Sequence, residues 1–175
     1  SSVFTKMLVH PKLTEAVADL IGPNVQLHHT KLHVKPPEKG SPFPLHQDYD
    51  YFPHEKDTMI AAVIYLEDVT EENGCLCVMP GVHAQGPLTH QHDGSHYLSP
   101  EEYTIEEATP RTGKAGDVVL FSYLTPHGSY PNRTSSPRRL VLFQFRSPTD
   151  KPLKEVHISP GQGMMVRGIN PALEI

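Results

Sequence analysis

Short apolar runs separated by proline and glycine constrain the fold of this chain more than any other feature. The 175 residues include 18 Pro and 12 Gly, and both residue types interrupt regular secondary structure. The run from Met59 to Leu66 is almost continuously apolar, which predicts a central strand buried on both faces. Shorter runs of this kind lie at Cys75–Met79, Val118–Phe121 and Arg139–Arg146. Short strands with frequent turns are typical of an all-β sandwich or barrel, and jelly rolls of this type bind ligands between their sheets.

The N-terminal part contains the one segment with a convincing helical pattern. Leu13, Val17 and Ile21 lie on one stripe of a predicted helix that starts near Pro11 and stops at Gly22. Residues 24–34 then alternate as a strand, and a proline-rich loop follows at 35–42. We expect residues 83–110 to form a polar excursion with some helix, and residues from 148 onward to wrap the surface. The predicted fold is a mainly β, single-domain jelly roll with few flanking helices.

Charge and cysteine usage limit the partners and the compartment. Lys and Arg total 15 against 20 Asp and Glu, a net charge of -5 with His neutral. Without a basic run, we expect no nucleic-acid or anionic-membrane partner. The sequence also shows no apolar segment of membrane-spanning length and no secretory leader pattern. Cys75 and Cys77 lie two apart in a predicted strand, where they are poorly placed to bridge each other, so we expect reduced thiols in a cytoplasmic protein.

A possible metal site begins at His46-Gln47-Asp48. In an extended strand the side-chain period is two, so His46 and Asp48 leave the backbone on the same face. The chain offers a third ligand downstream in His127. Two His and one carboxylate on one side of an ion leave the opposite positions open, which is the arrangement of non-haem Fe(II) oxygenases.

Arg138 follows His127 by eleven positions and supplies a second element of such a site. A hairpin of this length can return the chain so that Arg138 lies beside His127 and Ser129 on the same cavity wall. Arg clamps a carboxylate with two parallel N–H donors, and a neighbouring hydroxyl adds a third contact. An open metal site with a carboxylate clamp behind it fits 2-oxoglutarate as cosubstrate.

Several motifs, taken together, resemble the phytanoyl-CoA dioxygenase family. They agree in order and spacing from about Leu27 to Arg146, and they comprise Pro44-Leu45-His46-Gln47-Asp48, residues 73–83, residues 116–121, His127-Gly128-Ser129 and Arg138. The resemblance implies a double-stranded β-helix, a cupin-like barrel, with Fe(II) bound by His46, Asp48 and His127. It also implies that Arg138 with Ser129 anchors 2-oxoglutarate, and that Lys31 and His33 lie at strand positions that line the cosubstrate and substrate cavity. Family spacing favours Arg138 over the adjacent Arg139, which faces the opposite way in a strand.

The activity that this resemblance implies is hydroxylation of an unactivated C–H bond in a small organic substrate. Dioxygen is consumed, and 2-oxoglutarate is oxidatively decarboxylated to succinate and CO2. Asp48 is present where halogenating relatives carry a small residue, which points to hydroxylation. Family members have a longer N-terminal helical region, so we expect residues 1–175 to be the core domain without part of that region.

Two other functions remain open from the sequence. A cupin-like Zn or Mn enzyme would use the same three ligands, but it gives no role to Arg138 and Ser129. A non-catalytic small-molecule-binding protein would keep the barrel and lose turnover. The sequence leaves the substrate and the oligomeric state open.

The remaining polar and aromatic residues near these motifs receive structural interpretations. His90, His92 and His96 form either a second metal cluster or, as we favour, a solvated loop that contacts substrate at most as a lid. His28 and His29 are interpreted as satisfied strand residues, and His83 as a structural or cavity-rim residue. We expect Tyr49, Asp50 and Tyr51 to orient the metal ligands, and Phe43 with Leu45 to pack against the cosubstrate.

Overall fold

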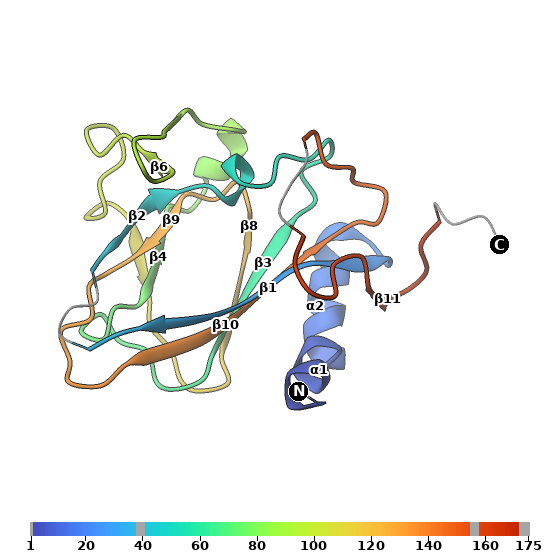
Figure 1. The fold of residues 1–175 in the computed structure, drawn as a ribbon, viewed down its shortest axis with the longest axis horizontal. Coiled ribbons are helices and arrows are strands. Elements are labelled where there is room, and N and C mark those ends of the chain that lie inside the picture. Colours follow the sequence, from blue (N-terminus) through green and yellow to red (C-terminus); the bar gives the residue numbers. More distant parts are fainter. Residues whose placement is uncertain (1, 38–40, 155–157, 172–175) are drawn as a thin grey trace.

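Two helices precede the β structure in the computed structural model, which describes residues 2–37, 41–154 and 158–171 (Figure 1). They are α1 (Ser2–Leu8) and α2 (Pro11–Ile21). The predicted helix is confirmed as α2, which buries Leu13 and Val17, whereas the sequence pattern did not predict α1. Gly22 ends α2 with φ of 98°, and its N–H donates to the Ala18 carbonyl at 2.8 Å. Glycine adopts this backbone conformation without steric strain.

The remaining elements are mostly strands, as the sequence predicted. Within the described residues they form a five-stranded sheet in the order β11-β1-β10-β3-β8, a four-stranded sheet in the order β2-β9-β4-β7, and the two-stranded hairpin β5-β6. Figure 1 shows the two larger sheets facing each other, with the helices beside one end of the larger sheet. The strands are β1 (Val25–Lys35), β2 (Phe43–His46), β3 (Ile60–Tyr65), β4 (Leu76–Val78), β5 (His90–Gln91), β6 (Tyr97–Leu98), β7 (Thr109–Arg111), β8 (Val118–Ser122), β9 (His127–Ser129), β10 (Arg138–Arg146) and β11 (Met165–Arg167).

The core lies on both faces of the larger sheet. On the helical side, Val17 of α2 packs in one cluster with Phe143 of β10. Between the sheets, Val63, Leu76 and Phe121 belong to a second cluster. Strand β3 lies inside the sheet, between β10 and β8, and is buried along its whole length, as its apolar run predicted. Side chains of this size each contribute about 1.5–3 kcal/mol when fully buried, so the facing sheets form a firm frame for any site between them.

The predicted hairpin between His127 and Arg138 is wrong. Strand β9 belongs to the smaller sheet and β10 to the larger one, so the connection between them crosses from one wall to the other. Arg138 instead pairs with Lys35 across β1 and β10. The sequence spacing allowed a hairpin, but strand pairing is decided by which apolar faces pack together. His127 and Arg138 therefore approach the space between the sheets from opposite sides.

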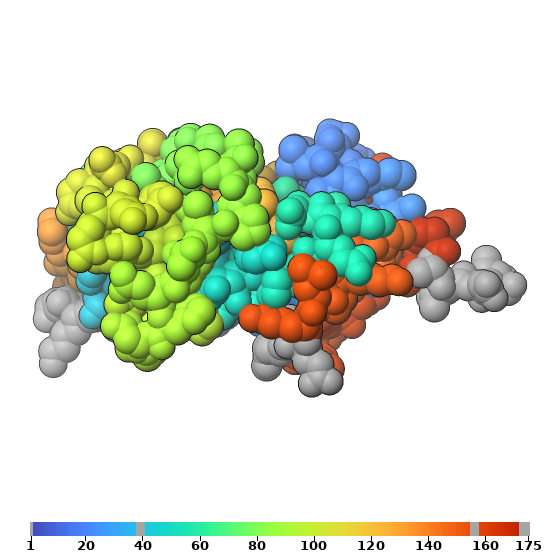
Figure 2. All heavy atoms as spheres, turned by 90° about the horizontal axis from the view of Figure 1, so that it is seen from above, coloured from blue at the N-terminus to red at the C-terminus, as the bar shows by residue number. Residues whose placement is uncertain are grey.

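The two surface predictions have different outcomes. The polar excursion ends close to Pro110, as expected, where β7 pairs with β4 and extends the smaller sheet. Its described residues contain the 3-10 turn η2 (Val82–Gln85) and the β5-β6 hairpin and no α-helix. Figure 2 shows this green-to-yellow segment lying against the turquoise segment that follows β2. The C-terminal part does more than wrap the surface, since β11 adds a strand beside β1. None of the described helices is long and apolar enough to cross a membrane.

Candidate metal and cosubstrate site

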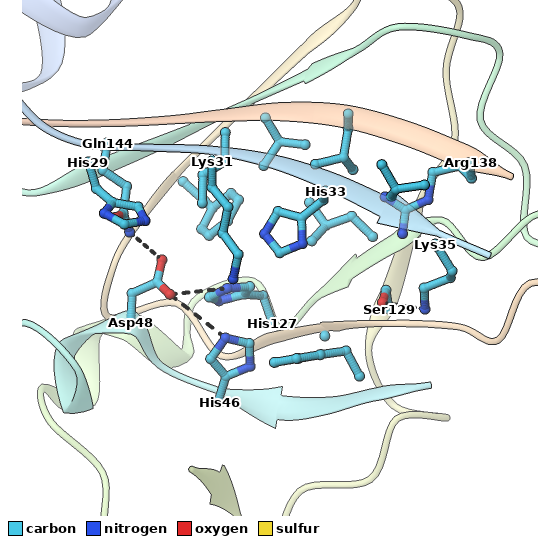
Figure 3. A pocket seen from close by; sticks show the side chains of 18 of the residues that line it. His29, Lys31, His33, Lys35, His46, Asp48, His127, Ser129, Arg138 and Gln144 are labelled. Carbon is cyan, nitrogen blue, oxygen red and sulfur yellow. Dashed lines mark hydrogen bonds and ion pairs between the residues drawn. The ribbon is translucent and has the colours of Figure 1, made fainter. Parts of the chain in front are cut away.

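A cavity of about 380 Å³ lies between the two sheets. Side chains from one face of β1 and from the neighbouring strand β10 line one wall of the cavity. Strands β2 and β9 of the smaller sheet supply the opposite wall (Figure 3). Residues from β1 and β10 in the lining include His29, Lys31, His33, Lys35, Arg138, Leu140, Leu142 and Gln144; those from the other wall include Phe43, His46, Asp48, His127 and Ser129.

His46, Asp48 and His127 converge at one end of this cavity. Nε2 of His46 and Nε2 of His127 each lie 3.7 Å from Oδ1 of Asp48. Two metal–ligand bonds of about 2.0–2.2 Å together exceed that separation, so a single ion can contact all three groups. His46 and His127 are direct partners across β2 and β9, and their rings are 4.2 Å apart. This short contact comes from strand pairing between segments about eighty positions apart.

The turn after β2 sets the direction of Asp48. The strand ends at His46, and Asp48 begins the 3-10 turn η1 (Asp48–Asp50), so the expected continuous strand is only partly correct. Gln47 is still extended, with φ of -105° and ψ of 138°. Because this single extended residue separates the two ligands, Asp48 projects to the same side as His46.

Backbone carbonyls fix both imidazoles in the form that a metal needs. Nδ1 of His46 lies 3.0 Å from the Pro44 carbonyl, and Nδ1 of His127 lies 2.9 Å from the Thr125 carbonyl. Each Nδ1 therefore carries the proton, and each Nε2 presents its lone pair to the cavity. Burial lowers the pKa of His46 from 6.5 to about 3 and that of His127 to about 4. Both rings are neutral at pH 7 and available for coordination.

Gln144 is a partner of Asp48 that sequence reasoning missed. Its side-chain amide donates to Oδ2 of Asp48 at 2.7 Å, which leaves Oδ1 directed at the two imidazoles. Burial raises the pKa of the Asp48 carboxyl, while His46 and Gln144 lower it. A cation bound beside this carboxyl would favour the charged form. The only signal in the sequence was a polar residue in the apolar strand β10, which by itself names no role.

Arg138 lies at the other end of the cavity. Its side chain is 4% exposed, and its Nε has no hydrogen-bond partner among the described residues. Burial lowers the pKa of Arg138, although Tyr65 and Glu67 partly offset that effect. A buried guanidinium with an unused donor is costly unless a ligand supplies an acceptor. Arg139 points to the other side of the strand and forms a 3.5 Å ion pair with Glu67.

Lys35 adds a second cation beside Arg138, and sequence reasoning missed it. Figure 3 shows its ammonium next to Ser129 at the Arg138 end, and Nζ donates to the Ser129 hydroxyl oxygen at 2.7 Å. It also donates to the carbonyls of Ser41 and Tyr130. Burial, and then the charge of Arg138, lowers the pKa of Lys35 from 10.5 to about 8. A usable signal existed, because Lys31, His33 and Lys35 are two apart and share one strand face.

Lys31 and His33 lie on β1 between the two ends of the cavity (Figure 3). Lys31 is exposed at the cavity edge, whereas His33 is half-buried. Burial, followed by the charges of Lys31 and Arg138, lowers the pKa of His33 from 6.5 to about 4. His33 is therefore neutral at pH 7, and the positive charges of this wall are those of Lys31, Lys35 and Arg138.

The aromatic residues around β2 divide between the cavity and the protein interior. Phe43 lines the cavity and meets the His46 ring edge-on at 4.8 Å, and Tyr51 lines it as well, 6.0 Å from the same ring. Leu45 points away from the cavity into a cluster with Cys77 and Leu98, so the expectation that it packs against the cosubstrate is wrong. Because neighbours in a strand face opposite ways, Leu45 and His46 cannot both face the cavity.

Tyr49 and Asp50 do not orient the metal ligands. Tyr49 packs 5.5 Å from the Tyr123 ring, and Asp50 hydrogen-bonds to His92 and His96. Both follow Asp48 in a 3-10 turn, which directs successive side chains around an axis. Only Tyr51 of the three residues expected in this role lies beside a ligand, His46.

His46, Asp48 and His127 are called the triad below. The histidines outside the triad differ from one another in burial and contacts. The expectation of a solvated position is wrong for His90, which is 9% exposed and accepts the Gln47 N–H on Nε2 at 2.8 Å. This bond supports the segment between His46 and Asp48. His28 is fully buried, and its Nε2 lacks a hydrogen-bond partner within the described residues. The expectation that both of its ring nitrogens are hydrogen-bonded is therefore wrong.

His29 lines the cavity, as noted above, but is not one of the three converging groups. His83 is exposed in η2 and is not part of the cavity wall.

Comparisons with known proteins agree with this fold. The family model described as Phytanoyl-CoA dioxygenase (PhyH) matches residues 1–140. A probable alpha-ketoglutarate-dependent hypophosphite dioxygenase of Stutzerimonas stutzeri is 31% identical over 150 residues, which cover 81% of this chain and 52% of the relative. The peroxisomal phytanoyl-CoA dioxygenase of Homo sapiens is 34% identical over 148 residues, which cover 78% of this chain and 44% of that protein.

A solved structure shows the same architecture. The non-heme monooxygenase ThoJ, in its apo form, matches with a TM-score of 0.83 and 26% identity, over 97% of this chain and 63% of that one. This likeness confirms the predicted mainly β, cupin-like jelly roll. The chain spans about half the length of the curated relatives it matches. Since the family model matches residues 1–140 of the 175, the chain belongs to the phytanoyl-CoA dioxygenase family.

Proposed function

We propose that this protein is an Fe(II)- and 2-oxoglutarate-dependent dioxygenase that hydroxylates an unactivated C–H bond of a small organic substrate. One observation carries the proposal. A two-histidine, one-carboxylate set occupies one end of a cavity whose other end holds the buried, partly unpartnered guanidinium of Arg138. The relatives named above as dioxygenases support the same reaction class.

The donor set fits Fe(II). Nε2 of His46, Nε2 of His127 and Oδ1 of Asp48 would hold the ion, since all three point at one place. Two imidazoles and a carboxylate suit non-haem iron with open positions. Asp48 also favours hydroxylation over halogenation, because its carboxylate fills the coordination position that a halide would need.

The opposite end of the cavity fits the far carboxylate of 2-oxoglutarate. Arg138 offers a planar pair of donors, and Lys35 contributes a second positive charge close to it. Because Ser129 accepts from Lys35, the proton of its hydroxyl is free to be donated to the same carboxylate. Two cations and a hydroxyl are well matched to a ligand that brings a full negative charge to this end.

When bound, Fe(II) and 2-oxoglutarate supply the oxidising chemistry, in which O2 is consumed and 2-oxoglutarate is converted to succinate and CO2. The protein's own residues bind, orient and exclude water. Gln144 holds Asp48 in its ligating orientation, and the carbonyls of Pro44 and Thr125 hold the two imidazoles. Apolar side chains such as Phe121 and Leu140 line the space between the two ends and keep it dry. Lys31 and His33 are the residues of β1 that would face cosubstrate and substrate.

The other two functions fit the site less well. A cupin-like Zn or Mn enzyme would use the triad but would leave Arg138 buried without an acceptor for its Nε. A non-catalytic binding protein would not need Gln144 to orient Asp48. Support for a cytoplasmic location comes from Cys75 and Cys77, which are both free thiols, the state that a reducing compartment maintains.

The experiment is a screen of small organic compounds scored by succinate formation from 2-oxoglutarate under air with Fe(II). We expect at least one compound to raise succinate release above the rate without substrate, and Asp48→Ala to abolish the increase. Asp68→Ala is the matched control, because Asp68 is exposed and pairs with Lys114. Full substrate-stimulated turnover in Asp48→Ala would refute the role of Asp48 as a ligand.

A further inference from the structure

A second group of potential metal ligands lies outside the proposed iron site. It consists of Asp50, at the end of the η1 turn, and of His92 and His96, in the loop that joins β5 to β6. One ligand atom from each side chain lies within 4.8 Å of the others. None of the three lines the cavity described above. The cluster therefore lies outside the space assigned to iron, 2-oxoglutarate and substrate.

The three side chains already point at one place. Oδ2 of Asp50 lies 2.9 Å from Nε2 of His92, and the same oxygen forms a hydrogen bond with Nδ1 of His96. The two imidazole rings are 4.7 Å apart and tilted by 48°. Two imidazole nitrogens and one carboxylate oxygen with a common focus are the donor types of zinc and similar transition metals. An ion at that focus would replace the two hydrogen-bonding protons.

The neighbourhood holds the cluster in position from three directions. Leu98 of β6 is buried against the smaller sheet, and His90 of β5 accepts the Gln47 N–H, so both ends of the loop are tied down. The Tyr51 ring lies 4.4 Å from the His96 ring. The side-chain ammonium of Lys154 donates to the main-chain carbonyl of Asp50 at 3.2 Å. The carboxylate of Asp50 is thus left to the two imidazoles.

Exposure distinguishes this cluster from the triad. The side chains of His92 and His96 are 58% and 40% exposed, and that of Asp50 is 20% exposed. Water can therefore fill further coordination positions, and the ion can exchange with solvent. A site of this kind binds more weakly than a closed four-ligand zinc site, since it has three protein ligands and little burial.

We propose that Asp50, His92 and His96 form a second site for a divalent transition metal of the zinc class. Asp48 and Asp50 belong to one 3-10 turn. The next residue, Tyr51, lies against the His96 ring and also lines the main cavity. An ion at the second site thus fastens the β5-β6 loop to the turn that carries the carboxylate of the proposed iron site. The second site does not depend on the proposed function, because it shares no ligand with the triad.

The test is the number of Zn(II) ions bound per chain, measured by equilibrium dialysis on four proteins. We expect the wild type to bind two, His92→Ala/His96→Ala to bind one, and His127→Ala to bind one, held by the second site. His10→Ala is the control, because His10 is exposed and belongs to neither cluster, and it should match the wild type. Equal Zn(II) binding by the wild type and His92→Ala/His96→Ala would overturn the proposal.

Two further measurements keep the test decisive if the double variant folds poorly. Asp50→Asn preserves the shape of the side chain and should also lose one ion. Anomalous diffraction at the zinc edge should show a peak between Asp50, His92 and His96 in zinc-soaked crystals. A peak at the triad alone would reject the second site and leave the proposed iron site intact.

Discussion

Gln144 donates a hydrogen bond of 2.7 Å from its side-chain amide to Oδ2 of Asp48, and both side chains are buried. This contact joins the last part of β10, on the larger sheet, to the turn after β2, on the smaller one. It fixes which carboxylate oxygen faces the two imidazoles. Partners of this kind around a metal ligand typically change metal affinity by tenfold to a hundredfold when they are removed.

Replacing Gln144 by Met should weaken Fe(II) binding about tenfold to a hundredfold, because Asp48 loses the donor that orients it. Anaerobic titration of the metal-free protein with Fe(II) measures the dissociation constant. Gln26→Met is the matched control, since Gln26 is also buried and donates instead to the Gly163 carbonyl at 3.0 Å. Wild-type Fe(II) affinity in Gln144→Met would show that Asp48 does not need this bond.

Replacing Lys35 by Met should raise the KM for 2-oxoglutarate about tenfold. The ammonium already donates to Ser41, Ser129 and Tyr130, so its contribution to the ligand is its charge. Unit charges about 4 Å apart attract each other by about 1 kcal/mol in water and about 4 kcal/mol near a protein surface, and about 1.4 kcal/mol corresponds to tenfold in affinity. The half-buried position of Lys35 favours the lower part of this range. Initial rates of succinate formation at varied cosubstrate concentration measure the change. Lys12→Met, on the exposed face of α2, is the control. An unchanged KM in Lys35→Met would remove Lys35 from the carboxylate clamp.

The affinity for 2-oxoglutarate should fall as pH rises above about 8. The pKa of Lys35 is lowered to about 8, so its ammonium is present below that pH and lost above it. A bound carboxylate shifts the loss to higher pH in the complex, so the free protein sets the pH at which KM begins to rise. The KM of the wild type should increase between pH 7 and 9.5, and that of Lys35→Met should change less. Parallel pH profiles for the two proteins would contradict the assignment.

Acid should destabilise the metal-free protein through His28. Burial lowers the pKa of His28 from 6.5 to about 3, so below pH 6.5 the unfolded chain takes up a proton that the folded chain does not. Stability is therefore full above pH 6.5 and is lost as pH falls. For one such histidine the loss between pH 7 and pH 5 is about 2 kcal/mol.

Urea unfolding at the two pH values tests this with His28→Leu, which should lose less stability on acidification than the wild type. The other buried histidines remain in both proteins, so the difference between them isolates His28. His10→Leu, at an exposed position, should behave as the wild type does. The same acid-induced loss in His28→Leu and in the wild type would assign the effect to other groups.

Much of the architecture was predictable because its signals are local. The apolar run at β3 and the alternation along β1 each identify a strand from a few neighbouring residues. His46 and Asp48 follow the same logic, since one extended residue separates them. The prediction that His127 joins them rested on chemistry and resemblance, and the structure brings the three side chains together.

Features that depend on pairing between distant segments were not predictable in this way. The spacing between β9 and β10 is compatible with a hairpin, and only the packing of the two sheets sends them to opposite walls. Gln144 gains its role from a contact 96 positions away, and His90 from one 43 positions away. Lys35 precedes a Pro-Pro loop, so the sequence pattern placed it in the loop, whereas β1 in fact continues through it and pairs it with Arg138.

The most direct measurement is the visible absorption spectrum of the anaerobic protein with Fe(II) and 2-oxoglutarate, compared with those of Arg138→Ala and Arg139→Ala. His46, Asp48 and His127 would hold the iron to which the keto-acid end of 2-oxoglutarate binds, and Arg138 would increase the affinity by holding the far carboxylate. We predict a weak metal-to-ligand band in the wild type and in Arg139→Ala, and its loss at the same cosubstrate concentration in Arg138→Ala. A wild type without the band, or an Arg138→Ala variant that keeps it at full strength, would contradict a single cavity that binds both iron and 2-oxoglutarate.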